Sequence, residues 1–122
     1  EIVEQAIVDA KENAKINGID NTEFIVGDTE KILDELINAR KIVPDAIMVD
    51  PPRRGLDNTS IDIILKIKPS RLIYISCNPA TLVRDLAKFE EVYDVRKIKP
   101  VDMFPFTSHV ECVAVLQLKQ DM

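Results

Sequence analysis

The sequence predicts an α/β fold in which a mostly parallel sheet carries helices on its faces. Short runs rich in β-branched and other apolar residues alternate with longer segments whose apolar residues repeat at helical spacing. Two of the short runs, 46–50 and 71–76, are almost continuously apolar, which is typical of strands buried on both faces of a parallel sheet. Such alternation of strands and helices along a chain builds α/β sheets.

Length and composition predict one packed globular domain that spans residues 1–122. The chain is 46% hydrophobic and 30% charged and has only 3 glycines. No apolar run approaches the roughly 20 residues that cross a bilayer, so we expect no membrane partner and a cytoplasmic location. The net charge of −5 does not by itself indicate nucleic-acid binding, which depends on neutralising phosphates.

The first third of the chain predicts a helix, a strand and a second helix. Apolar residues from Val3 to Ala14 form a stripe at helical spacing, and Asn17-Gly18 is a typical helix end. The run 22–26 is short and rich in β-formers, which favours a strand. In 29–40 the apolar residues return to helical spacing.

The middle of the chain predicts two further strand–helix units. The expected elements are a strand at 46–50, a helix at 59–68, a strand at 71–76 and a helix at 79–89. The last helix has a clear start signal, with Asn78 as N-cap and Pro79 in the first turn.

Two strands complete the predicted fold. Alternating patterns at 92–101 and 110–119 favour strands, and an eight-residue loop joins them. Ligands of parallel sheets bind beyond the carboxyl ends of the strands. Asp28, Asp50 and Cys77 each follow a predicted strand, so we expect them at one edge. If the last strand runs antiparallel, its start brings Glu111 to the same edge.

Each of these residues has a plain structural reading beside a chemical one. Cys77 precedes a helix N-terminus, which lowers a thiol's pKa, but a small residue also suits such a turn. Asp50 is either a turn acid or a carboxylate that two prolines hold at the ligand edge. Glu111 either points to solvent or is a general base. For Asp28, the local sequence favours a structural role as the cap of the helix that begins at Thr29.

Metal and disulfide chemistry are not expected. The sequence has a single histidine, His109, and two dispersed cysteines, Cys77 and Cys112, which do not have the spacing of metal ligands. One bridge in a chain without a secretory signal is less expected than two free thiols.

Three motifs taken together resemble a known family. The segments "DPPRRGLD" (50–57), "YISCNPATLVRDL" (74–86) and "VDMFPFTSHVECVAVL" (101–116) occur in the order seen in S-adenosylmethionine-dependent RNA uracil-5-methyltransferases. Within that family the bacterial 23S ribosomal RNA type looks closest. The resemblance covers essentially the whole chain and implies that residues 1–122 are the C-terminal part of a methyltransferase catalytic domain.

The resemblance implies roles for four residues. On the family's pattern, Cys77 is the nucleophile that adds to uracil C6, which activates C5 for methylation, and Glu111 is the base that removes the C5 proton. Asp50 matches the acid that holds the target uracil, and Arg53 would lie on the same rim. The product would be 5-methyluridine in ribosomal RNA or, as the alternative, in transfer RNA.

The resemblance also implies cofactor contacts and a truncated sheet. Glu1 matches the acid that binds the ribose of S-adenosylmethionine, Asp28 flanks its adenine, and Asp50 borders its site as well. The expected fold is the Rossmann-like class I methyltransferase sheet, of order 3-2-1-4-5-7-6 with an antiparallel last strand. Here the first two strands and their glycine-rich loop would be missing. Some members add an iron–sulfur cluster in an N-terminal segment that this chain lacks.

Two other readings remain open. The 122 residues taken alone would be a non-catalytic fragment that binds no cofactor and self-associates through an exposed sheet edge. Alternatively, "DPP" also occurs in adenine amino-methyltransferases, where an aromatic residue follows the prolines. Two features argue against this reading. Arg53 stands where those enzymes have the aromatic residue, and they do not need a cysteine at the position of Cys77.

Overall fold

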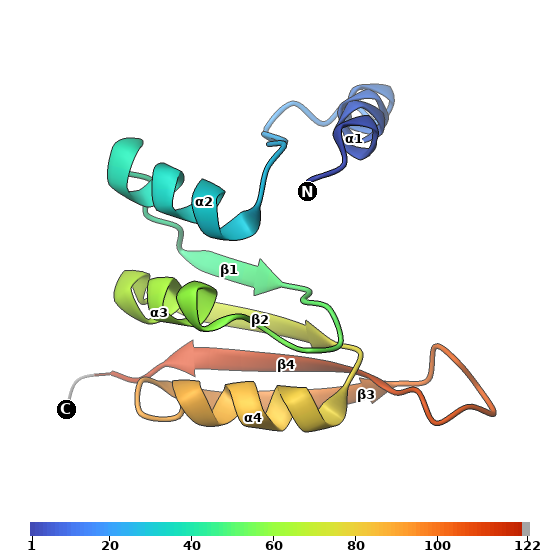
Figure 1. The fold of residues 1–122 in the computed structure, drawn as a ribbon, viewed down its shortest axis with the longest axis vertical. Coiled ribbons are helices and arrows are strands. Elements are labelled where there is room, and N and C mark those ends of the chain that lie inside the picture. The colour runs from blue at the N-terminus through green and yellow to red at the C-terminus, as the bar shows by residue number, and fades with distance from the viewer. Residues whose placement is uncertain (121–122) are drawn as a thin grey trace. The chain divides into compact units, whose positions relative to one another are not determined.

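The computed structural model describes residues 1–120, and the chain forms two compact units, Glu1–Ile42 and Val43–Met122 (Figure 1). The first unit contains α1 (Glu4–Ile16), α2 (Thr29–Asp34) and the π-helical turn η1 (Glu35–Ala39). Helix α1 ends as predicted: Gly18 has φ +66°, and the N–H of Ile19 donates to the carbonyl of Ala14 over 2.8 Å. A glycine suits this left-handed position because it has no Cβ.

The predicted helix at 29–40 changes type halfway along. Asp28 caps α2, accepting a 3.0 Å hydrogen bond from the N–H of Glu30. After Asp34 the helix widens into η1, and the N–H of Arg40 bonds five residues back to the carbonyl of Glu35. The position of the helix is therefore confirmed, and its regular α-geometry is wrong for the second half.

The predicted strand at 22–26 is wrong. This segment joins no ladder, because within residues 1–42 the structure describes no strand that could pair with it. Side chains hold the segment instead: the Arg40 guanidinium donates to both carboxylate oxygens of Glu23, at 2.7 and 3.0 Å. That hydrogen bond holds the pKa of Glu23 below its usual value.

The second unit is a four-stranded sheet with two helices. Its elements are β1 (Ala46–Val49), α3 (Asn58–Ile67), β2 (Arg71–Ser76), α4 (Pro79–Phe89), β3 (Tyr93–Val101) and β4 (Glu111–Leu118). The strand order is β1-β2-β4-β3, with β1 parallel to β2 and β4 antiparallel to both of its neighbours. This is the 4-5-7-6 portion of the expected methyltransferase order, and β1 is an edge strand.

The strand register brings the ends of β1, β2 and β3 and the start of β4 to one end of the sheet. Val49 is level with Tyr74, so β1 and β2 end at the same edge. Cys112 is level with Ser76, so β4 begins where β2 ends. Val101 and Glu111 pair at the base of the loop between β3 and β4. The turns after β1 and β2 and the β3–β4 loop therefore share this edge.

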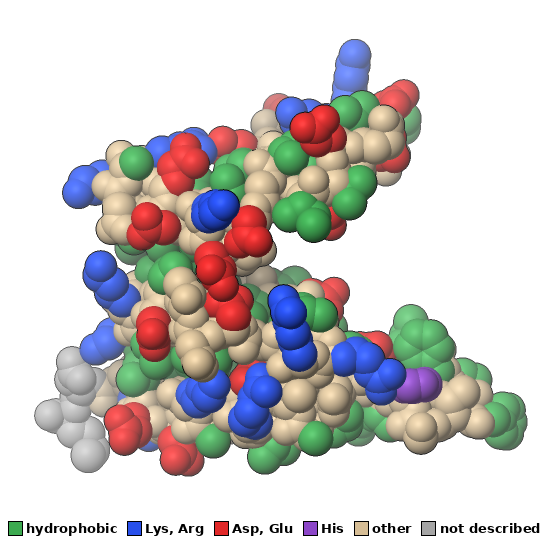
Figure 2. Space-filling model, in the orientation of Figure 1, with side chains coloured by type: hydrophobic (Ala, Val, Ile, Leu, Met, Phe, Trp, Pro, Cys, Tyr) green, Lys and Arg blue, Asp and Glu red, His purple; other side chains and the backbone are tan. Residues whose placement is uncertain are grey.

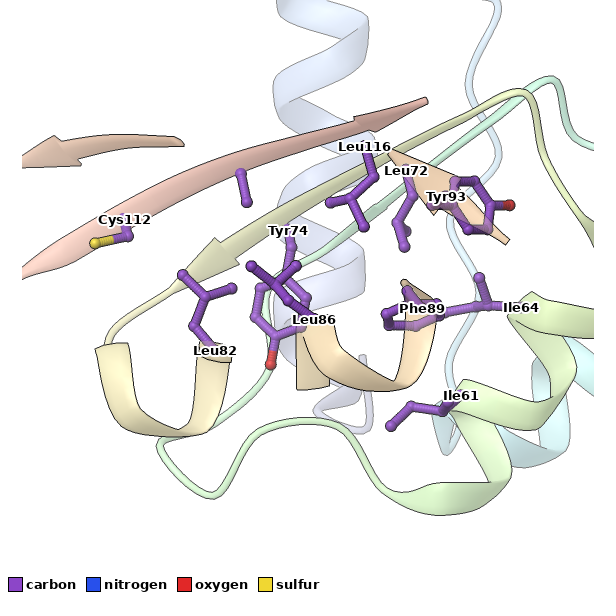
Figure 3. Close-up of a cluster of buried hydrophobic side chains, with 11 residues drawn as sticks. Ile61, Ile64, Leu72, Tyr74, Leu82, Leu86, Phe89, Tyr93, Cys112 and Leu116 are labelled. Atoms are coloured by element: carbon purple, nitrogen blue, oxygen red, sulfur yellow. The ribbon is translucent and has the colours of Figure 1, made fainter. Parts of the chain in front are cut away.

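Helices α3 and α4 cover one face of the sheet (Figures 1 and 3). In each helix the apolar residues that recur at helical spacing point inward, which removes their apolar surface from water. The core comprises Ile61, Ile64, Leu72, Tyr74, Leu82, Leu86, Phe89, Tyr93, Cys112, Ala114 and Leu116. Within residues 1–120, no helix is long and apolar enough to span a membrane.

The carboxylate of Asp85 on α4 is completely buried next to this core. Its Oδ2 accepts hydrogen bonds from the Tyr74 hydroxyl at 2.6 Å and from the N–H of Leu56 at 2.8 Å. Its Oδ1 accepts two from the guanidinium of Arg84, at 3.0 and 2.8 Å. Burial, followed by the bond to Asp85 and the charge of Asp85, raises the pKa of Tyr74. The carboxylate thus links β2, α4 and the turn before α3.

We expect Tyr74→Phe to destabilise the protein more than Tyr93→Phe does. Both hydroxyls are buried, but Tyr74 donates to a carboxylate and Tyr93 donates to the neutral carbonyl of Pro69 at 2.8 Å. Hydrogen bonds to charged groups contribute about 1.5–3 kcal/mol and neutral ones about 0.5–1.5 kcal/mol. Urea unfolding of the two variants measures the difference, and equal losses would contradict a stronger hydrogen bond from Tyr74 than from Tyr93.

Stability should fall at alkaline pH because tyrosines are buried in the neutral form. Burial raises the pKa of Tyr93 to about 12, whereas an unfolded tyrosine titrates near about 10. The unfolded chain therefore loses its proton first, so the free energy of unfolding declines between about pH 10 and 12. Unfolding of Tyr93→Phe over this range should show a shallower decline than wild type, and an identical slope would show that Tyr93 is not its source.

Candidate active site at the carboxyl edge of the sheet

Cys77 lies in a short turn that is fixed on both sides. β2 ends at Ser76, and the Ser76 hydroxyl accepts from the N–H of Asn78 at 3.0 Å and donates to its carbonyl at 2.9 Å. The Asn78 side chain then caps α4, accepting from the N–H of Ala80 at 3.1 Å. Cys77 is consequently a half-buried free thiol that directly precedes the capped N-terminus of α4.

The turn that follows β1 packs against the start of α4. The N–H of Gly55 donates to the carbonyl of Pro52 at 2.9 Å, and Gly55 has φ +81°. A Cβ at Gly55 would lie 2.5 Å from the Asp85 carboxylate, so glycine is required both by its backbone angle and by the space. The Arg84 guanidinium, already bonded to Asp85, also donates to the carbonyl of Arg54 at 2.7 Å.

Arg53 is held at its backbone by the turn that carries the cysteine. Its carbonyl accepts from the Asn78 amide at 3.2 Å and from the Thr81 hydroxyl at 2.9 Å. Its guanidinium lies 3.0 Å from Nδ1 of His109. Because arginine can only donate, Nδ1 accepts this hydrogen bond, and the ring proton of a neutral His109 is on Nε2. Figure 2 shows basic side chains beside the lone histidine.

Glu111 begins β4 next to the cysteine turn. Ser76 pairs with Cys112 across the antiparallel β2–β4 ladder, so the continuation of that register sets Cys77 opposite Glu111. Glu111 is half-buried, whereas Cys112, the next residue, points into the core. The half-buried acid is thus held near the thiol by the ladder.

These segments enclose one pocket of about 310 Å³, lined by Arg53, Cys77, Phe104, His109 and Glu111. Three of the five residues, Arg53, Cys77 and Glu111, are ones the sequence indicates. The sequence patterns address His109 only as a metal ligand, and they do not indicate Phe104. The Phe104 ring meets the His109 ring edge to face, with centroids 6.2 Å apart. Their position in the loop before β4 is the signal that could identify both.

The other three predicted site residues do not line this pocket. Asp50 follows β1 directly, at the carboxyl edge, and is exposed. Glu1 and Asp28 belong to the first unit, where each carboxylate accepts from a nearby backbone N–H, Glu1 from Val3 at 2.9 Å. Among residues 1–120, no group of histidine, cysteine and acidic side chains could hold a metal ion.

Known proteins share both sequence and fold with this chain. An RNA methyltransferase of Halalkalibacterium halodurans, named as uncharacterized, is 52% identical over 120 residues, which cover 98% of this chain and 26% of that protein. A similarly named protein of Listeria innocua is 48% identical over 120 residues, with the same coverage. This chain thus spans about a quarter of the length of these relatives.

Solved structures agree with the fold. The tRNA (uracil-54, C5)-methyltransferase of Pyrococcus abyssi, in complex with S-adenosyl-L-homocysteine, superposes with a TM-score of 0.77 at 36% identity, over 95% of this chain and 27% of that one. An rRNA methylase of Streptococcus thermophilus has a TM-score of 0.64 at 19% identity, over 98% of this chain and 71% of that one, and supports the fold alone.

The fold therefore corresponds to part of the S-adenosylmethionine-dependent methyltransferase sheet, as the family resemblance implies, although two of the three strand pairings are antiparallel and the sheet is not mostly parallel. A profile of the family described as tRNA (Uracil-5-)-methyltransferase matches residues 1–119. The pocket residues Arg53, Cys77 and Glu111 all fall inside that match. This chain belongs to the tRNA (uracil-5-)-methyltransferase family.

Proposed function

We propose that this chain is the part of an RNA uracil-5-methyltransferase that activates the target base. The observation that supports this function best is the single pocket that contains Cys77, Arg53 and Glu111. A nucleophile, a cation and a carboxylate are the three groups that an addition–elimination reaction on uracil requires. The relatives are about four times longer than this chain. The proposed reaction of the whole enzyme makes 5-methyluridine in RNA.

In the first step, the Cys77 thiolate adds to C6 of the uracil and electron density moves to C5. The Arg53 guanidinium, which lines the same pocket, stabilises the negative charge of the enolate that forms. When bound, S-adenosylmethionine supplies the methyl group that C5 takes up. Glu111 then removes the proton from C5, and the electrons of that C–H bond expel the thiolate, which returns Cys77 to its starting form.

Asp50 is proposed as the acceptor for the uracil N3–H, and as a neighbour of the methyl donor. Its support is its place after β1 at the same edge, where Pro51 and Pro52 restrict the backbone. Glu1 and Asp28 are proposed to hold the ribose and adenine of S-adenosylmethionine. The N–H of Gly27 donates to the carbonyl of Glu1 at 2.9 Å, which keeps these two exposed acids in neighbouring segments. Carboxylates fit hydroxyl and amino donors of that kind.

The charge distribution is compatible with an RNA substrate. Residues 43–122 contain eleven acidic and eleven basic side chains, so the net charge of −5 comes entirely from residues 1–42. The unit with the pocket is thus neutral overall and has the exposed arginines Arg53 and Arg54 in the turn after β1.

The substrate class is proposed from the three motifs at 50–57, 74–86 and 101–116. Their resemblance to the ribosomal RNA type of the family favours ribosomal RNA, so the proposed process is rRNA processing in the cytoplasm. The self-association expected of the isolated chain is a proposal for sedimentation to test.

Substitution of the nucleophile and of the base should stop the reaction at different points. In the full-length enzyme, Cys77→Ala should form neither product nor covalent RNA adduct, because unactivated C5 does not attack a methyl donor. Glu111→Gln should still add and methylate, then stall as a methylated protein–RNA adduct. Denaturing gels with labelled RNA and a labelled methyl donor distinguish the two outcomes.

Ribosomal and transfer RNA fractions tested side by side in that assay identify the substrate class. Labelled transfer RNA with unlabelled ribosomal RNA would overturn the ribosomal proposal. Turnover by Cys77→Ala, or full activity of Glu111→Gln without a trapped adduct, would mean that the nucleophile or the base is assigned to the wrong residue.

Arg53 should control the reactivity of Cys77. We expect Arg53→Ala to slow the alkylation of Cys77 by the anionic reagent iodoacetate more than that by neutral iodoacetamide, because Arg53 and Cys77 line one pocket and a guanidinium attracts a negative reagent. Arg54→Ala is the matched control, since it retains the carbonyl that Arg84 binds and its side chain does not line the pocket. Cys112, which is buried, is the internal reference in peptide mass spectrometry. Equal ratios of the two alkylation rates in Arg53→Ala and Arg54→Ala would remove Arg53 from the site.

A further inference from the structure

We infer that Phe106 is a stacking platform for the unpaired RNA base next to the target uridine. The inference rests on the proposed function and extends it to a part of the surface outside the pocket. It assigns a binding role to the loop between β3 and β4, whose large apolar side chains Met103, Phe104 and Phe106 are all exposed.

The loop is a folded turn and not an open connection. The N–H and the hydroxyl of Thr107 both donate to the carbonyl of Phe104, at 3.2 and 2.7 Å, which closes a four-residue turn. The N–H of His109 donates to the Thr107 hydroxyl at 3.2 Å, and the N–H of Met103 donates to the carbonyl of Val101 at 3.1 Å. The turn therefore presents its side chains in a defined direction.

Phe106 has an unfavourable position in this turn. Pro105 occupies the second position, and Phe106 occupies the third with φ +64°. A type II turn needs positive φ there, which glycine or asparagine adopts readily and a bulky side chain does not. The Phe106 side chain is also fully exposed, with a relative accessibility of 108%. Neither the backbone nor the core of this unit gains from a phenylalanine here, so the ring is available for another molecule.

The surroundings of the turn favour a nucleobase as that molecule. The turn begins at Phe104, which lines the pocket with Cys77 and contacts His109, so the surface is continuous with the proposed uracil site. Arg53 brings a positive charge to the same rim, 3.0 Å from His109, and RNA supplies phosphates to match it. Proteins bind unpaired bases by stacking them on exposed aromatic rings while basic side chains contact the backbone. Figure 2 shows hydrophobic side chains around the histidine.

The test measures RNA binding by the full-length enzyme with Phe106→Tyr, Phe106→Leu and Phe106→Gly. The probe is a nine-nucleotide single-stranded RNA with one central uridine and adenosines elsewhere, and fluorescence anisotropy gives its Kd without methyl donor. Phe106→Tyr should bind within about 2-fold of wild type, and Phe106→Leu and Phe106→Gly should each lose about 10-fold. Leucine preserves apolar contact without a stacking face, so wild-type affinity in Phe106→Leu would overturn the inference.

Phe106→Gly contains its own folding control. Glycine adopts φ +64° without strain, so this variant should unfold at the same temperature as wild type or a higher one. A loss of RNA affinity in a variant that is no less stable cannot come from unfolding. Sedimentation of the same variant tests a protein partner: a change in self-association with unchanged RNA affinity would overturn the base-stacking role.

An abasic nucleotide on either side of the uridine identifies the stacked base. One of the two abasic probes should lose about 10-fold with wild type, and on that probe Phe106→Leu should cause no further loss. If the affinity losses from the abasic nucleotide and from Phe106→Leu add up on both probes, the inference is overturned. The Cys77 adduct assay distinguishes failure of the stacking role from failure of the proposed function. If the enzyme forms the adduct but wild type and Phe106→Leu bind RNA equally well, only the stacking role is refuted. Absence of both adduct and binding refutes the proposed function as well.

Discussion

The buried carboxylate of Asp85 is the constraint on which the site depends. It is fully enclosed, and it accepts hydrogen bonds from β2 through Tyr74, from α4 through Arg84 and from the turn after β1 through Leu56. A buried charge without partners costs several kcal/mol, so the three elements must come together around this group. Residue 55 is a glycine because a side chain there would collide with the Asp85 carboxylate.

This anchor explains how an exposed arginine can have a defined place beside a thiol. Arg53 is only two residues from Gly55, and its carbonyl is bonded to Asn78 and Thr81 at the start of α4. Asn78 also caps the helix next to Cys77. The backbone of the turn and the backbone around Cys77 are therefore parts of one hydrogen-bonded unit, which fixes where the Arg53 side chain starts.

Sequence patterns were sufficient for most of the second unit because its elements agree with its tertiary contacts. The predicted strand 71–76 and the predicted helix 79–89 match β2 and α4, since the apolar run of the strand and the cap and first-turn proline of the helix agree with the tertiary contacts. The segment 22–26 shows the limit of this reasoning. Its residues favour a strand, but a strand also needs a partner, and the described part of the first unit offers none.

For the site, the sequence by itself determined which residue types end the strands, and its motifs identified Cys77, Arg53 and Glu111 as candidates. Only the tertiary structure decided that these three share one pocket, that His109 accepts a hydrogen bond from Arg53, and that Phe104 completes the wall. The reason is physical. Residue chemistry and local periodicity are encoded by near neighbours, whereas ladder register and the contact between residues 53 and 109 depend on chain segments far apart in the sequence.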